Sequence, residues 1–140
     1  MAEIGDIVTI TVSRRGSPMN IQLDTIRIFV SDVARAKPFY QDALGLSLEV
    51  DSAQEGFLVF RSADVSIVVE NSEVSDDTTG ELLVGRFTGL SFKVEDISES
   101  YNKLTRSDVE FLDPPENQPW GGTIASFKDP DGNILTLVQT

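Results

Sequence analysis

The sequence predicts an α+β fold made of two similar modules, each with one strand, one helix and three further strands. Residues 26–30 and 90–94 carry large apolar side chains at every second position, the period of a strand with two different faces. A segment with helical spacing follows each of them, and short apolar runs separated by turns come next. The same order of patterns therefore occurs twice in the chain.

In the first half, the predicted helix has recognisable ends. Ser31 or Asp32 can cap its first turn, and Gly45 suits the left-handed residue that ends a helix. Pro38 lies inside this segment and removes a backbone hydrogen bond, so we expect a kink or a late start. Two strands joined by a hairpin turn are predicted after the helix, with the apolar runs at 56–60 and 65–69 and the turn at 61–64.

The second half repeats this plan. Asp96 followed by Glu99 resembles a capping box at the start of a helix. Prolines at 114, 115 and 119 then force a loop. The remaining apolar runs are at 109–112, 123–127 and 134–138, with a tight turn at 129–132.

Changes in composition divide the chain. We predict an N-terminal extension at 1–22, a first module at 23–72, an acidic linker at 73–85 and a second module at 86–140. Apolar residues alternate between Ile7 and Val12, which predicts an added edge strand able to pair across a dimer.

Length and charge limit the classes of function. A chain of 140 residues with 40% hydrophobic residues suits one domain with an ordinary core. No apolar run reaches the roughly 20 residues of a membrane helix, so we expect no membrane segment and no signal peptide. The chain has no Cys, which leaves the compartment open, with the cytoplasm as the default expectation. The net charge of -12 argues against nucleic-acid binding, because clustered Lys and Arg neutralise a phosphate backbone.

Several motifs occur together in this order. Val-Ser-Asp-Val at 30–33 ends a strand, Phe-Tyr at 39–40 and Leu-Gly-Leu at 44–46 belong to a helix, and Asp-Pro-Asp-Gly-Asn at 129–133 precedes the last strand. Together they resemble the vicinal oxygen chelate superfamily, which includes glyoxalase I, extradiol dioxygenases, fosfomycin-resistance enzymes and bleomycin-binding proteins. The resemblance implies two βαβββ modules whose curved mixed sheets surround a cavity, completed within one chain or across a homodimer.

The resemblance also indicates where metal ligands would stand. In metal-dependent members they come from the first and last strands of each module, and these positions here hold Thr25, Val68 or Val69, Gly89 and Thr136, none of them a good ligand. The chain has no His and no Cys, which excludes a histidine-bound iron, nickel or zinc site. Glu70 is the only nearby carboxylate for a hard cation, so we expect no metal and no cofactor.

Side-chain alternation predicts which residues face the cavity. Thr25, Arg27 and Phe29 lie on the strand face opposite the helix, and Ser91 and Lys93 lie on the equivalent face of the second module. With the loop tryptophan and the last-strand position, the ligand-binding candidates are Thr25, Arg27, Phe29, Ser91, Lys93, Trp120 and Thr136.

Two of these candidates have alternative interpretations. Arg27 can hold a carboxylate or phosphate-like group of a ligand, or it can pair with Asp24 or Glu70, and the 23 acidic residues favour the pair. Trp120, the only tryptophan, can stack on a flat ligand or cover the core beside Gly121 and Gly122.

Other polar residues suit structural roles. Tyr40 and Phe39 belong to the apolar helix face and are predicted to be core residues. Asp129 and Asp131 could be mistaken for a catalytic carboxylate pair, but their spacing suits a tight turn with Gly132 at positive φ.

Three functions from different classes remain. The leading hypothesis is a metal-independent small-molecule-binding protein of the bleomycin-resistance type, with its ligand in a sheet-lined cavity. The alternative is a lyase or isomerase in which Arg27 stabilises an oxyanion and Glu70 or Tyr40 acts as acid or base, with or without an all-oxygen divalent metal site. A third is a regulatory or structural dimer with a closed cavity. The acidic net charge favours a cationic ligand and Arg27 an anionic one.

Overall fold

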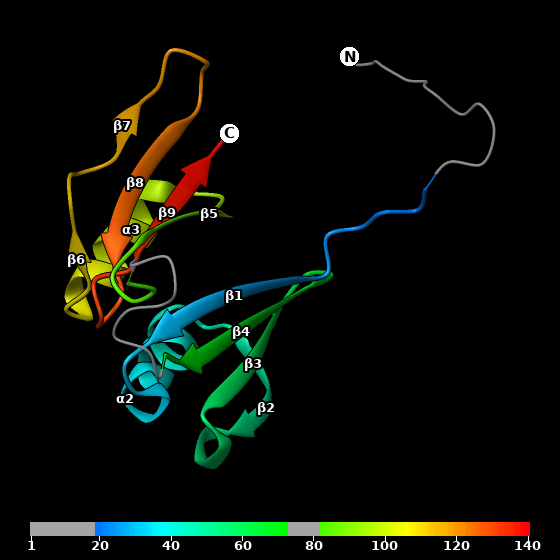
Figure 1. Cartoon of the computed structure of the whole chain (residues 1–140). Helices are drawn as coiled ribbons and strands as arrows, with labels where there is room; N and C mark the ends of the chain where they lie inside the picture. Colours follow the sequence, from blue (N-terminus) through cyan, green and yellow to red (C-terminus); the bar gives the residue numbers. More distant parts are fainter. Residues whose placement is uncertain (1–18, 73–81) are drawn as a thin grey trace.

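The computed structural model describes residues 19–72 and 82–140, and it contains two β-sheets, each with a helix packed on one face (Figure 1). The predicted α+β class is confirmed. The expected strand between Ile7 and Val12 and most of the acidic linker lie outside the described residues.

The first sheet has the strand order β1-β4-β3-β2. Its parallel pair, β1 with β4, joins strands separated by the helix, and the other neighbours are antiparallel. The strands are β1 (Thr25–Val30), β2 (Ser47–Ser52), β3 (Phe57–Ser62) and β4 (Val65–Asn71).

The helix of the first module begins where the sequence indicates. Asp32 is the N-cap of α2 (Val33–Pro38), and its side chain accepts a hydrogen bond from the Ala34 backbone N–H. The chain then continues directly after Pro38 as a π-helix, η1 (Phe39–Ala43). The helix therefore has no late start, and the irregularity comes after Pro38.

The second sheet has the order β5-β9-β8-β6, and β7 also pairs with β8. Asp96 caps its helix by accepting a hydrogen bond from the Glu99 N–H, which is one of the two hydrogen bonds of the predicted capping box. The elements are β5 (Phe87–Lys93), α3 (Ile97–Arg106), β6 (Glu110–Phe111), β7 (Glu116–Asn117), β8 (Thr123–Lys128) and β9 (Ile134–Gln139).

One hydrophobic core connects the modules. On β1, Ile28 and Val30 are buried beneath α2, while Thr25 and Arg27 on the alternate positions are exposed. Phe39 of η1 lies 6.2 Å from Phe127 of β8, centroid to centroid, so the helical side of the first module packs against the second. Each sheet consequently has one face turned toward this core and one face turned away from it.

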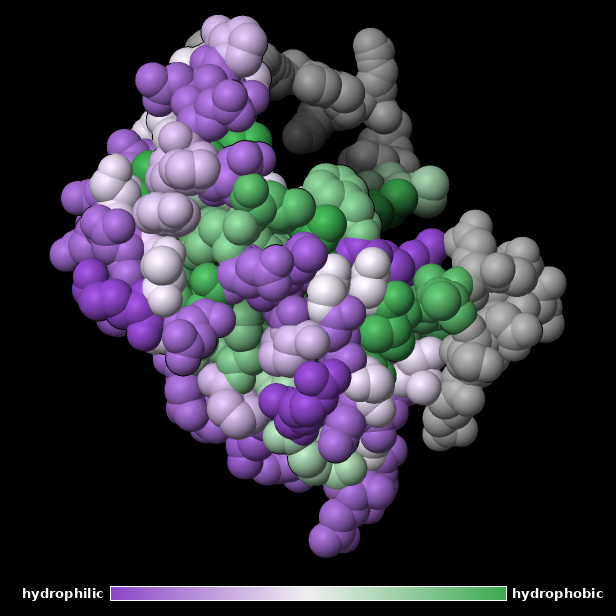
Figure 2. Space-filling view, turned by 90° about the vertical axis from the view of Figure 1, so that its left-hand side faces the viewer, coloured by the Kyte–Doolittle hydropathy of each residue, from purple (hydrophilic) through white to green (hydrophobic). Residues whose placement is uncertain are grey.

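Among the described residues, no helix has the length and apolar content needed to cross a membrane. The surface is polar at its margins, and Figure 2 shows hydrophobic residues gathered in a hollowed central zone of one face.

Candidate functional site

The face of the first sheet that is turned away from α2, here called the first open face, combines apolar side chains with one charged pair. Strand register aligns its residues in rows: Arg27 lies opposite Val68 and Val68 opposite Val59, while Phe29 lies opposite Glu70 and Glu70 opposite Phe57. Its members are half-buried or exposed, and they are Thr25, Arg27, Phe29, Phe57, Val59, Val68 and Glu70.

Arg27 forms a two-point ion pair with Glu70 on this face. Its Nε donates to one carboxylate oxygen at 2.8 Å and a terminal nitrogen donates to the other at 3.0 Å. The guanidinium carbon also lies 5.1 Å from the centroid of the Phe29 ring, within the range of a cation–π contact. The hydrogen bond to Glu70 and the negative charge of that carboxylate raise the pKa of the Arg27 guanidinium above its ordinary value.

The expected salt bridge of Arg27 is thus confirmed, with Glu70 as its partner, and Asp24 instead accepts a hydrogen bond from the Thr25 hydroxyl. The Arg27 side chain remains 61% exposed and that of Glu70 21% exposed. Both groups can therefore still meet a ligand that lies on the first open face.

The corresponding face of the second sheet, here called the second open face, carries a row of hydroxyl groups. Ser91 lies opposite Thr136 in β9, and Thr136 lies opposite Ser126 in β8. The hydroxyls of Ser126 and Thr136 are 2.9 Å apart, and Thr136 is buried, so in this row Ser91 is the exposed member. The β5 register shifts between Phe87 and Ser91, around Gly89, so the resemblance-derived ligand position at Gly89 offers no side chain there.

Trp120 lies on the loop between β7 and β8, away from both rows. Its ring lies directly over Gly122, where an added Cβ would stand 2.0 Å from Cζ3 of the ring. The side chain is 61% exposed. The indole therefore packs on the loop backbone and keeps a surface available for stacking.

The sequence candidates do not all come together at one cavity. Arg27 and Phe29 line a cavity of about 220 Å³ where β1 approaches β5, with Phe87 and Leu90 on its other side. Lys93 lines a separate groove, Ser91 and Thr136 lie on the second open face, and Trp120 lies on its loop. A larger cavity of about 590 Å³ lies between α2 and the loop after α3, and no candidate lines it.

Metal binding finds little support in these side chains. Within residues 19–72 and 82–140, no three Asp or Glu side chains are arranged to hold an ion. Glu70 is engaged by Arg27, and Thr25 and Thr136 each offer a single neutral oxygen. Ca²⁺ takes six to eight oxygen ligands, and Mg²⁺ is held through one or two carboxylates together with its waters. With its only nearby carboxylate paired to Arg27, this set of side chains is a poor fit for either ion.

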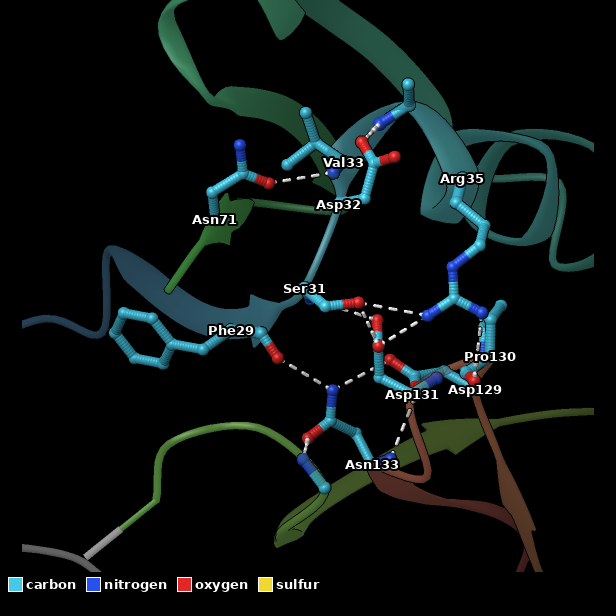
Figure 3. A network of polar contacts seen from close by, with 12 residues as sticks. Phe29, Ser31, Asp32, Val33, Arg35, Asn71, Asp129, Pro130, Asp131 and Asn133 are labelled. Carbon is cyan, nitrogen blue, oxygen red and sulfur yellow. Dashed lines mark hydrogen bonds and ion pairs between the residues drawn. The ribbon is translucent and has the colours of Figure 1, made fainter. Parts of the chain in front are cut away.

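The Asp129–Gly132 turn is structural, as predicted, and it also joins the modules (Figure 3). Asp129 accepts hydrogen bonds from the backbone N–H groups of Asp131 and Asn133. Asn133 donates from Nδ2 to the Phe29 carbonyl at the end of β1, and Asp131 pairs with Arg35 of α2 at 2.6 Å. This inter-module network fixes β1, and with it Arg27, relative to the second sheet.

Tyr40 is a core residue, as the sequence predicts. It is fully buried, and its hydroxyl donates to Asp129 Oδ2 at 2.6 Å. Burial, and then the charge of Asp129, raise the pKa of Tyr40 far above its ordinary value. Because its side chain is buried and its hydroxyl is bound to Asp129, Tyr40 is poorly placed for the acid or base role that the alternative hypothesis gives to Glu70 or Tyr40.

Sequence reasoning missed three site residues: Phe57 and Val59, which extend the first open face, and Ser126, which completes the hydroxyl row. The alternation within β3 and β8 carries this information, since Leu58, Phe60, Ala125 and Phe127 are the buried positions of these strands.

Comparison with known proteins supports this architecture. Residues 22–137 match the family described as glyoxalase/bleomycin resistance protein/dioxygenase superfamily. A crystal structure of a member of that superfamily from Sphaerobacter thermophilus DSM 20745 is 31% identical, with a TM-score of 0.72, and the match covers 86% of this chain and 98% of that one. TnmS3, an antibiotic-binding protein from Streptomyces sp. CB03234, is also 31% identical with a TM-score of 0.72, over 87% and 98% of the two chains. The bleomycin resistance protein of Klebsiella pneumoniae is 37% identical over 54 residues, which are 34% of this chain and 43% of that protein.

Proposed function

Since the chain belongs to the glyoxalase/bleomycin resistance protein/dioxygenase superfamily, we propose that it binds a small organic molecule without the help of a metal. The ligand lies on the first open face, against the Arg27–Glu70 pair. The antibiotic-binding neighbour TnmS3 is 31% identical over nearly its whole length, which favours an antibiotic or a similar natural product as the ligand.

One observation carries the proposal: an ion pair set among apolar side chains on an open sheet face. Small-molecule sites combine mostly apolar and aromatic walls with a few fixed polar groups. The first open face has this composition, with Phe29, Phe57, Val59 and Val68 around Arg27 and Glu70. Because Arg27 is held at two points and lies over Phe29, its remaining N–H groups point in a fixed direction, which reduces the entropy lost on binding.

The donor set supports metal independence. The sequence contains no imidazole and no thiol, and the nearest carboxylate, Glu70, is already paired. Recognition then depends on shape, stacking and hydrogen bonds to the pair.

The test is a binding titration of chelator-treated protein with metal-free bleomycin and a panel of flat aromatic antibiotics, followed by calorimetry and thermal shift. We expect at least one compound to bind and to raise the melting temperature, because a ligand that binds only the folded state stabilises it. Arg27→Gln and Phe29→Ala should each lower the affinity for that compound by about tenfold, which corresponds to about 1.4 kcal/mol of binding free energy.

Arg106→Gln is the matched control, since it removes one exposed arginine charge from α3, away from the first open face. Its affinity should equal that of the wild type. The proposal fails if no compound binds, or if all three variants weaken binding equally. Binding that appears only after a divalent metal is restored contradicts metal independence.

A second candidate, a lyase or isomerase, is favoured by the contact of a carboxylate with an arginine on an accessible face. Glu70 would move the proton and Arg27 would stabilise the oxyanion. Exchange of a ligand C–H for deuterium in heavy water, lost in Glu70→Gln, would favour this candidate over simple binding. Unchanged exchange in that variant would exclude Glu70 as the base.

We also propose a homodimer. Five large apolar side chains are at least 60% exposed near the free edges of the sheets or in the segments leading to them: Met19, Ile21, Leu23, Leu82 and Phe87. A second copy that covers them would remove this surface from water. Sedimentation equilibrium measures the oligomeric state, and a chain that stays monomeric at all micromolar concentrations contradicts the proposed homodimer.

A further inference from the structure

A second groove lies between the modules on their helical side, separate from the first open face. We propose that it binds a small straight-chain carboxylate, with the hydrocarbon chain between the modules and the carboxylate at the lysines of the groove. This site is independent of the function proposed above, because its lining shares no residue with the first open face.

The groove has the size and the walls of a ligand site. Its volume is about 320 Å³, near the lower end of the roughly 300–1,000 Å³ typical of small-molecule pockets. Leu44 and Leu46 come from the end of the first helix, Phe92 and Val94 from the end of β5, and Leu104 from α3. The apolar walls therefore belong to both modules.

The base of the groove is part of the shared core. Leu104 and Leu137 are only 6% and 4% exposed, whereas Leu44, Leu46 and Phe92 are partly buried and pack against that core. A hydrocarbon chain in the groove would cover these partly buried side chains. Removing this apolar surface from water favours binding.

The polar lining is positive and contains hydroxyl groups. Lys93 and Lys103 both line the groove, and no acidic side chain of residues 19–72 or 82–140 does, although the chain carries 23 acidic residues and a net charge of -12. Neither lysine forms an ion pair with another residue of the described segments. Ser62 and Ser100 are half-buried at the groove, and their hydroxyls can donate to an anion.

These features together select the ligand. An apolar groove lined by two exposed lysines, neither in an ion pair within the described residues, complements a molecule with an apolar tail and an anionic head. A cation would meet like charge here, and a neutral chain would leave both ammonium groups without a partner. A carboxylate can accept hydrogen bonds from a lysine and a serine together, so it suits this lining.

The experiment uses three probes with the same chain length: octanoate, 1-octanol and octylammonium. Each is titrated into ¹⁵N-labelled full-length protein, and amide shifts are followed. We expect octanoate to shift the amides of Leu44, Leu46, Phe92 and Val94, and to bind about tenfold more tightly than octylammonium, a ratio that corresponds to about 1.4 kcal/mol.

Variants distinguish a lysine site from general attraction to positive charge. The double variant Lys93→Gln/Lys103→Gln should bind octanoate with about tenfold lower affinity. Arg106→Gln, in the last turn of the same helix and outside the groove lining, should leave its affinity unchanged. Should the double variant be poorly folded, the single Lys103→Gln variant serves, because this lysine is exposed on α3.

Three outcomes would overturn the inference. The first is an absence of shifts at the groove amides, and the second is equal affinity for octanoate and octylammonium. The third is that shifts appear at Val59 and Val68 and disappear in Arg27→Gln, which would place octanoate on the first open face. That third result would rule out the groove as the carboxylate site and would leave the proposed function unaffected. Failure of the antibiotic titration, in turn, leaves the groove unaffected.

Discussion

Tyr40→Phe tests the buried part of the inter-module network most directly. Asp129 is 5% exposed and accepts four hydrogen bonds, from the Tyr40 hydroxyl at 2.6 Å, from the Asp131 N–H at 2.9 Å, and from the N–H and Nδ2 of Asn133 at 2.8 and 2.9 Å. The substitution removes one donor and leaves the ring, with its contacts to Phe39 and Phe60, in place.

The expected cost follows from the kind of hydrogen bond that is lost. A hydrogen bond to a charged group contributes about 1.5–3 kcal/mol, and the carboxylate that loses it stays buried. We therefore expect the free energy of unfolding to fall by about 2 kcal/mol. For a chain of this length, that corresponds to a decrease of about 8 °C in melting temperature.

Urea denaturation at neutral pH measures this loss, with Tyr101→Phe as the matched control. Tyr101 packs its ring on Phe111 at 4.6 Å, and its hydroxyl makes no hydrogen bond within the described residues. The control should change stability by less than about 0.5 kcal/mol. Equal stabilities of the two variants would refute the reasoning, because the Tyr40 hydroxyl would then contribute nothing through Asp129.

Three further outcomes are expected. Gly122→Ala forces the Trp120 ring off the loop, because the added methyl group would lie 2.0 Å from the ring. Indole emission should therefore change, and the free energy of unfolding should fall by less than about 1 kcal/mol. Unchanged emission would contradict the packing of the ring on Gly122. Asp131→Asn weakens the ion pair with Arg35, whose side chain is exposed. The free energy of unfolding should fall by about 1 kcal/mol at low salt and by less at 1 M salt, because salt screens the pair. A loss that does not depend on salt would show that charge is not the cause. The hydrogen bond from Lys37 lowers the pKa of Asp51, so Lys37→Gln should raise it, measured by NMR titration. A lowered folded-state pKa stabilises the fold at pH values above the unfolded-state pKa, and this stabilisation is lost as the pH falls through the folded-state pKa. The stability of the Lys37→Gln variant should therefore be less sensitive to acid. An Asp51 pKa unchanged by the substitution would exclude Lys37 as the cause of the shift.

Strand faces were predictable from the sequence because alternation is a local property. On β1, Ile28 and Val30 are buried and Arg27 is exposed, as the spacing indicates. The cap at Asp32 and the turn at Asp129–Gly132 were predictable for the same reason, since a side chain that bonds its own neighbouring backbone needs no distant partner. The α+β class followed from these local patterns.

Contacts between distant residues were not predictable in this way. The sequence left Asp24 and Glu70 as alternative ion-pair partners of Arg27. The register of β1 against β4, which places Phe29 opposite Glu70, brings Glu70 within reach of Arg27. The hydrogen bond from Tyr40 to Asp129 joins residues 89 positions apart, and no periodicity carries that information. For Pro38, the sequence predicted a disturbance but not its form, a π-helix.

The register of Arg27 and Glu70 also resolves two conflicting indications about the ligand. The net charge of -12 favours a cationic ligand, whereas an arginine on an open face favours an anion. With Glu70 bound at two points, the charges of the pair cancel locally, and the neighbouring side chains Phe29, Val59 and Val68 are apolar. The first open face therefore suits a ligand with little net charge and an extended apolar or aromatic surface. A polar group of that ligand would add to the existing pair without having to neutralise it.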